Sequence, residues 1–212
     1  MLMRPVSCLL VLVAAGAVVP PSAPGQARFE LGPLLTAYTP LGSFDPAPYY
    51  STALPNTPGD LGGIGWGGEG RVWLSHRAGI QLQFARTSSS VGGGNTPAGP
   101  AASTPASVLT ISAQALYDLS PGTPGRVRLW LGAGAGVVRH GGTAYARYGD
   151  PAQVATALSF GSAFPLHGRL SAHLGVTTLL YYIDVSDSMG TSLEHGFQLD
   201  PLFHAGFDWG WP

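Results

Sequence analysis

Histidine is the side chain best suited to proton transfer and metal ligation near neutral pH, and this sequence contains six. Their spacing matches no known chemical pattern. The sequence has no HExxH zinc motif and no GxSxG nucleophile motif, and no two histidines lie close together along the chain. The six are His76, His140, His167, His173, His195 and His204. We therefore predict no catalytic residue, no metal site and no cofactor, and we do not expect an enzyme. No ligand-binding residue can be named from the sequence.

Charged residues are the other group that chemistry could use, and they are few. They make up 10% of the sequence, whereas an average soluble domain has about 25%. All ten basic side chains are arginine, and the net charge is −1. A nucleic-acid-binding protein would show a basic patch or stripe, so we expect no nucleic-acid partner. So low a charge content favours a surface that contacts lipid.

Residues 1–27 have the three parts of a cleaved secretory signal peptide. A positive residue stands near the start, an unbroken apolar stretch covers 8–19, and small residues precede a cleavage point after Ala27. The apolar stretch of about 12 residues is too short to cross a bilayer, which takes about 20. We expect an exported domain over 28–212. The single cysteine, Cys8, lies in the signal, so this domain has no thiol for disulfides or catalysis.

From residue 28 onward, apolar and polar residues alternate with a period of two, as in a β-strand with one apolar face. In the clearest segment, Leu109, Ile111 and Ala113 alternate with Thr110, Ser112 and Gln114. The segments with this pattern are 28–38, 64–74, 80–85, 106–119, 126–138, 154–164, 169–182 and Phe203–Trp211. Strands of about 10 residues are long enough to span a bilayer when tilted.

The connections between these segments alternate in length. Long ones are expected over 39–63, 91–105, 140–153 and 184–197, and short ones over 75–79, 120–125 and 165–168. All the long connections then fall on one side, as in bacterial outer-membrane barrels with an even number of strands. The sequence therefore predicts an all-β fold, an eight-stranded antiparallel transmembrane up-and-down β-barrel.

Aromatic residues on the outward face gather at the strand ends next to the short turns. Their rings prefer the headgroup region of a membrane, so we interpret them as an aromatic girdle at one interface. The predicted girdle consists of Phe29, Tyr117, Phe164, Trp209 and Trp211. Trp66 and Tyr182 would mark the opposite interface.

The chain resembles the small outer-membrane β-barrels of Gram-negative bacteria, the group that includes OmpA-like and OmpW-like barrels. The resemblance covers about 28–212 and is one of pattern. Its motif-like parts are the start Phe29-Glu30-Leu31-Gly32 and the aromatic terminal strand Phe203–Trp211. The resemblance implies location in the cell outer membrane, outer-membrane lipid as a partner, and recognition of the terminal strand by the outer-membrane insertion machinery. We expect a monomer.

Five titratable residues point inward in this arrangement: Glu30, Glu69, Arg71, Arg128 and Asp208. An eight-stranded barrel is narrow enough for side chains to fill it, and buried charges must be paired. We therefore predict a structural ion-pair network in the lumen; an ion path or catalytic cluster is the alternative. Inward glycines in the other half either permit close packing or leave a cavity.

Three classes of function are compatible with these patterns. The first is a structural or surface-presenting outer-membrane barrel with an occluded polar lumen and no catalysis. The second is a narrow channel or binding barrel for small hydrophobic molecules. The third is a secreted, soluble, lipocalin-like barrel, which would need an apolar interior and a polar exterior, the reverse of the alternation in 106–119.

Overall fold

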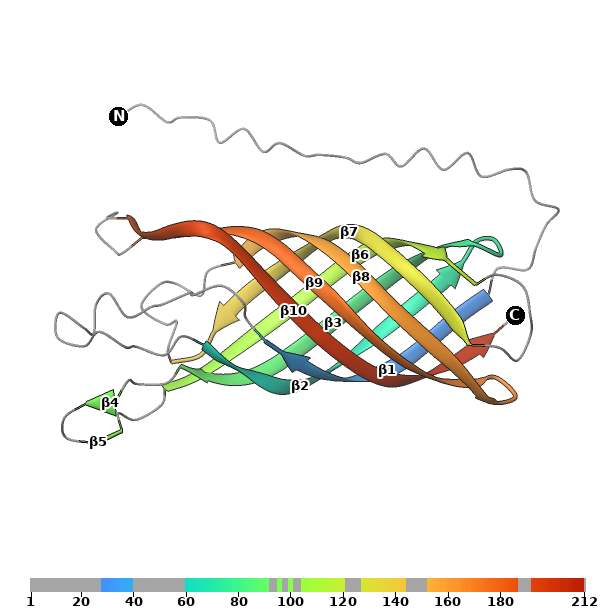
Figure 1. Cartoon of the computed structure of the whole chain (residues 1–212), viewed down its shortest axis with the longest axis horizontal. Helices are drawn as coiled ribbons and strands as arrows, with labels where there is room; N and C mark the ends of the chain where they lie inside the picture. Colours follow the sequence, from blue (N-terminus) through green and yellow to red (C-terminus); the bar gives the residue numbers. More distant parts are fainter. Residues whose placement is uncertain are drawn as a thin grey trace, which may run out of the picture.

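The computed structural model describes residues 28–39, 60–91, 95–96, 99–100, 104–120, 127–143, 152–186 and 192–211. The predicted signal peptide lies outside these residues. The strands are β1 (Arg28–Tyr38), β2 (Asp60–Trp73), β3 (Ala78–Val91), β4 (Asn95–Thr96), β5 (Gly99–Pro100), β6 (Thr104–Asp118), β7 (Arg128–Gly141), β8 (Ala152–His167), β9 (Leu170–Ser186) and β10 (Ser192–Trp211). Figure 1 shows a cylinder of tilted strands, with β4 and β5 lying outside it.

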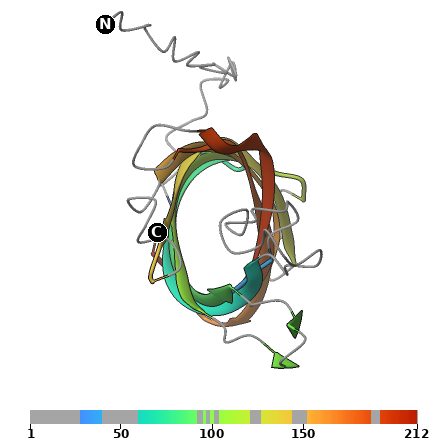
Figure 2. The ribbon, with the colours of Figure 1, turned by 90° about the vertical axis from the view of Figure 1, so that its left-hand side faces the viewer.

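Eight of these strands close into a barrel in the order β1-β10-β9-β8-β7-β6-β3-β2. Every neighbouring pair is antiparallel. Figure 2 shows the strands as a closed ring. The ring closes where the first strand pairs with the last, with Phe29 opposite Trp211. The predicted eight-stranded up-and-down barrel is confirmed. Strands β4 and β5 form a separate two-stranded sheet within the connection between β3 and β6.

The two ends of the barrel differ in their connections. At one end, which we call the turn end, β2–β3, β6–β7 and β8–β9 are joined, and both Arg28 and Trp211 lie there (Figure 1). The tightest of these turns contains Gly168, whose φ of 59° is a left-handed conformation that favours glycine. The opposite end, the loop end, carries the connections after β1, β3, β7 and β9.

Several strands continue beyond their predicted limits at the loop end. The long connection predicted over 184–197 is wrong, because β9 runs to Ser186 and β10 starts at Ser192, and these two residues pair. β2 likewise starts at Asp60. Alternation marks only the part of a strand that separates an apolar from a polar environment. Main-chain hydrogen bonds can extend a hairpin past that part without leaving the pattern in the sequence.

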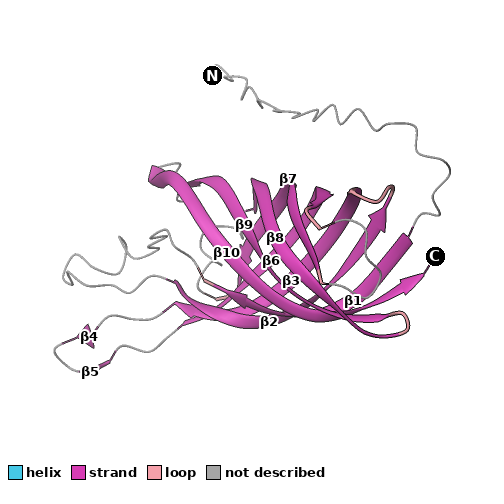
Figure 3. Cartoon of the chain, turned by 45° about the vertical axis from the view of Figure 1, so that its right-hand side comes forward, coloured by secondary structure: helices cyan, strands magenta, loops and turns pink. Residues whose placement is uncertain are grey.

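The predicted alternation of faces is confirmed, and the barrel is apolar outside. On β6, Thr110, Ser112 and Gln114 are buried in the lumen, whereas Ile111 is 53% exposed on the outer face. Leu35 on β1 is 63% exposed in the same way. The described residues form strands and the turns between them, and none of them forms a helix (Figure 3). Accordingly, no helix in the described ranges is long and apolar enough to cross a membrane.

Candidate functional site

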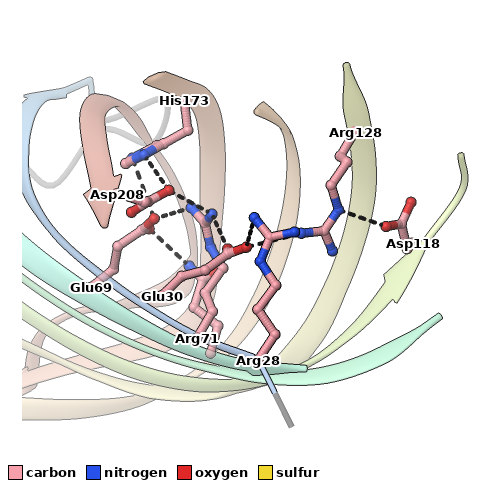
Figure 4. A network of polar contacts seen from close by, with 9 residues as sticks. Arg28, Glu30, Glu69, Arg71, Asp118, Arg128, His173 and Asp208 are labelled. Atoms are coloured by element: carbon pink, nitrogen blue, oxygen red, sulfur yellow. Dashed lines mark hydrogen bonds and ion pairs between the residues drawn. The ribbon is translucent and has the colours of Figure 1, made fainter. Parts of the chain in front are cut away.

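The half of the lumen nearer the turn end contains a network of charged side chains centred on Arg71 of β2 (Figure 4). Its guanidinium donates to Asp208 of β10 at 2.9 Å and to Glu30 of β1 at 3.4 Å, and it also bonds Glu69 of its own strand. Arg71 is 1% exposed. It can reach all three acids because β1 lies between β2 and β10 in the closed ring.

Arg128 of β7 joins this network from the far wall. It donates to Glu30 at 2.9 Å and to Asp118 of β6 at 2.9 Å. Arg28, half exposed at the turn end, pairs with Glu30 at 2.9 Å. The structure thus brings together all five residues predicted to face the lumen. Sequence reasoning left Arg28 and Asp118 out of the network, although Asp118 lies on the inward side of the predicted 106–119 strand.

Two tryptophans fill the space around the guanidinium groups. Arg71 lies 4.2 Å from the ring centroid of Trp130, and Arg128 lies 4.0 Å from that of Trp73. Both tryptophans are buried. A cation over an indole face is stabilised by the ring quadrupole, by about 2 kcal/mol or more where water is excluded. Charge pairing and aromatic packing therefore occupy the same layer of the lumen.

Gly161 of β8 makes room for Trp130, and a methyl group there should disturb it. A Cβ atom at Gly161 would lie 2.3 Å from Cζ2 of Trp130. We expect Gly161→Ala to lower the free energy of unfolding by about 1–3 kcal/mol, the usual cost of overpacking. Urea titration in detergent micelles measures this change. Gly70→Ala is the control, because its Cβ would meet its nearest neighbour, Leu31 Cδ1, at 3.6 Å. Equal losses in the two variants would contradict the steric argument.

Two buried histidines lie next to this network. Nδ1 of His173 lies 2.9 Å from Oδ2 of Asp208, and its Nε2 lies 3.3 Å from Oε1 of Glu69. The ring centroids of His173 and His204 are 5.9 Å apart. The sequence spacing showed no close histidine pair. Antiparallel pairing of β9 with β10 brings them together, since His204 is opposite Gly175 and His173 is opposite Gly206.

The half of the lumen nearer the loop end combines an apolar cluster with buried polar residues such as His140, Gln198 and Asp200. The apolar cluster consists of Tyr38, Ala85, Ala106, Val108, Val138, Ala155, Ala157, Leu179, Tyr181 and Leu202. Within it lies the buried carboxylate of Asp200, which accepts hydrogen bonds from the hydroxyls of Tyr38 and Tyr181 and from Gln198 at 3.0 Å. The sequence prediction included neither this cluster nor its tyrosines.

The inward glycines are close-packed wherever their surroundings are described. A Cβ at Gly132 would lie 2.2 Å from Oγ of Ser159, and one at Gly175 would lie 2.5 Å from Cε1 of His204. At Gly134 the obstacle is the main chain of the neighbouring strand, with Ala113 O at 2.0 Å. Of the two interpretations of these glycines, this geometry favours close packing over a cavity.

The aromatic residues predicted to form a girdle all lie on the outer face near the turn end. Their exposed fractions range from 36% to 48%, and the residues are Phe29, Tyr117, Phe164, Trp209 and Trp211. The hydroxyl of Tyr117 accepts a hydrogen bond from Arg77 of the β2–β3 turn at 2.9 Å. Trp66, which the sequence predicts at the opposite interface, lies in the middle of β2, is 62% exposed and packs edge-on against Phe84.

The comparisons with known proteins concern the fold. No family model and no curated protein matches the sequence. Among solved structures, the barrel is similar to the outer membrane protein OprG from Pseudomonas aeruginosa, with 11% identity, 87% of this chain and 96% of that chain covered, and a TM-score of 0.60. It is similar to the outer membrane protein AlkL in DMPC bilayers, with 15% identity, coverage of 90% and 92%, and a TM-score of 0.54.

A third similar structure is a major outer membrane protein from Thermus thermophilus, with 15% identity, coverage of 88% and 100%, and a TM-score of 0.51. Each match covers almost the whole of the other chain, so the likeness extends over the entire barrel. The chain therefore has the closed eight-stranded antiparallel barrel fold of small bacterial outer-membrane proteins.

Proposed function

We propose that this protein is an outer-membrane β-barrel, exported by its N-terminal signal, that presents its loops at the cell surface and performs no catalysis. The apolar outer face supports lipid as its partner. Leu82 and Ile111, for example, are 61% and 53% exposed on that face, where a soluble barrel would bury such side chains or replace them with polar ones. This exterior argues against the secreted lipocalin-like alternative.

We propose further that the lumen is occluded, and the buried network around Arg71 is the observation that carries this proposal. The ion pairs connect β1, β2, β6, β7 and β10 across the lumen. Trp73 and Trp130 lie against their guanidinium groups. An ion crossing the barrel would have to separate these largely buried ion pairs, which is costly.

Conductance recordings in planar bilayers test the occlusion. The unmutated protein should show little or no steady current, because the paired charges block the half of the lumen nearer the turn end. The double substitution Arg71→Ala and Arg128→Ala should introduce a leak, since it removes both inward cations and the aromatic contacts they make. A large, stable open-channel current from the unmutated protein would contradict the proposal and favour a channel.

A binding barrel for small hydrophobic molecules is the second candidate, and the apolar cluster near the loop end favours it. Leu179 and Leu202 are each 1% exposed there, among other apolar residues. Binding would require these side chains to move apart. Saturable binding of a small apolar fluorophore that is lost in Leu179→Gln would support this candidate over a purely structural barrel.

A further inference from the structure

His173, His204 and Glu69 place three potential metal ligands at one point of the lumen. One donor atom from each residue can be chosen so that all three atoms lie within 4.8 Å of one another, and all three residues are buried. A tetrahedral zinc ion with bonds of about 2.1 Å holds its ligand atoms about 3.4 Å apart. Nε2 of His173 and Oε1 of Glu69 are already 3.3 Å apart.

The surroundings of His173 match those of a metal-binding histidine. Its Nδ1 lies 2.9 Å from the carboxylate of Asp208, while its Nε2 faces Glu69. Histidines that bind metals usually direct their second ring nitrogen to a carboxylate, which fixes the tautomer and the ring orientation. Arg71 in turn donates to Asp208 at 2.9 Å, so the carboxylate behind the histidine is itself held in place (Figure 4).

A buried ring nitrogen without a hydrogen bond also points to a missing ligand. Within the described part of the chain, Nδ1 of His204 has no partner, while its Nε2 lies 3.4 Å from Oγ1 of Thr177. The two rings lie against glycines: a Cβ at Gly206 would be 2.7 Å from Cε1 of His173, and one at Gly175 would be 2.5 Å from Cε1 of His204. Buried polar atoms in proteins are almost always satisfied, by protein, water or an ion.

The charge of the network also favours a bound cation. Four buried carboxylates belong to it: Glu30, Glu69, Asp118 and Asp208. Opposite them stand the guanidinium groups of Arg71, which is buried, of Arg128, whose side chain is 21% exposed, and of Arg28, whose side chain is 49% exposed. The carboxylates outnumber the guanidinium groups by one, so the network carries an excess of negative charge that attracts a cation.

We propose that His173, His204 and Glu69 bind a divalent transition-metal ion, with zinc the ion that this set of two imidazoles and one carboxylate suits best. Glu69 would offer the ion Oε1, the oxygen that faces His173 and now accepts a hydrogen bond from Arg71, while its Oε2 keeps the hydrogen bond from Gln81. The ligands come from β2, β9 and β10, which flank the closure of β1 on β10. The ion would therefore link β2 to β9 and β10 across β1, at the place where the ring closes.

Zinc retention after refolding tests this proposal without requiring ions to enter a closed lumen. The unmutated protein is refolded from urea into detergent micelles with either Zn²⁺ or EDTA, desalted, and its metal content is measured. We expect one tightly held zinc ion per chain and a higher urea midpoint with Zn²⁺ than with EDTA, because metal binding is coupled to folding. Co²⁺ in place of Zn²⁺ should give the visible absorption of a tetrahedral site.

His173→Gln and His204→Gln should each lose the retained zinc, and Asp208→Asn should weaken zinc binding about 10–100-fold, as for other residues behind a ligand. His140→Gln is the matched control, since His140 is also buried in the lumen but lies in the layer nearer the loop end. If a variant does not refold, X-ray absorption of the unmutated zinc protein still decides, since it must show two imidazole ligands.

Two results would overturn the proposal. In the first, the unmutated protein retains no zinc and gains no stability from it. In the second, His204→Gln and His140→Gln retain zinc equally, which would place the ion on other histidines. Neither result would affect the proposal that the lumen is occluded.

Discussion

Arg71→Leu should lower the free energy of unfolding by about 3–5 kcal/mol, the usual cost of removing one partner from a buried ion pair. The side chain is 1% exposed and contacts three carboxylates, which would lose their central cation. Leucine fills part of the space but cannot pair with these acids. Urea-induced unfolding in detergent micelles or lipid vesicles, followed by tryptophan fluorescence, measures the change.

Two further variants serve as the control and the rescue test for this measurement. Arg169→Leu, at an exposed position in the β8–β9 turn, should change stability by no more than about 0.5 kcal/mol. Adding Glu69→Gln to Arg71→Leu should recover part of the loss, because one buried negative charge disappears with its partner. If Arg71→Leu and Arg169→Leu cost the same, the lumen network does not stabilise the barrel.

Ile111→Arg should destabilise the inserted barrel by about 2–4 kcal/mol, the cost of a lipid-facing arginine near the middle of a bilayer. Ile111 is 53% exposed on the outer face of β6, close to the middle of that strand. The matched control is Tyr117→Arg, on the same face of the same strand at the turn end, where the cost should fall to about 0–1 kcal/mol. Reversible folding into lipid vesicles compares the two.

This pair of variants separates lipid from water as the medium around the barrel. Both positions are similarly exposed, at 53% and 48%, so a surface in water would tolerate both substitutions to the same degree. Only a bilayer makes the cost depend on depth. Equal effects at Ile111 and Tyr117 would therefore contradict the proposed membrane location, whatever the fold.

The number of barrel strands and the direction of their side chains could be predicted because both depend on local patterns. A side-chain period of two assigned Ile111 outward and Ser112 inward, and the alternating connections indicated how the strands are joined. The same parity placed Glu30, Arg71 and Asp208 in the lumen. These predictions need no knowledge of which residue stands opposite which.

Relations between strands could not be predicted from local patterns. His173 and His204 become neighbours only through the register of β9 on β10, where His204 is opposite Gly175. Asp118 reaches Arg128 through the register of β6 on β7, which places Asp118 opposite Trp130. The apolar cluster around Leu179 was missed because an apolar residue on the inward face breaks the alternation that revealed the strands.

The pairing of β1 with β10 means that the barrel cannot be completed until the last strand is present, since Phe29 at the start of β1 pairs with Trp211 at the end of β10. Contacts between the two ends of a chain carry the largest loop-closure entropy and form slowly. Until then β1 and β9 are open edges of the sheet. Their main-chain N–H and C=O groups are unpaired, and such groups are too costly to place in hydrocarbon. Folding and entry into the membrane must therefore be concerted. Asp208 reaches Arg71 only at that moment, so the lumen ion-pair network is completed in the final event of assembly.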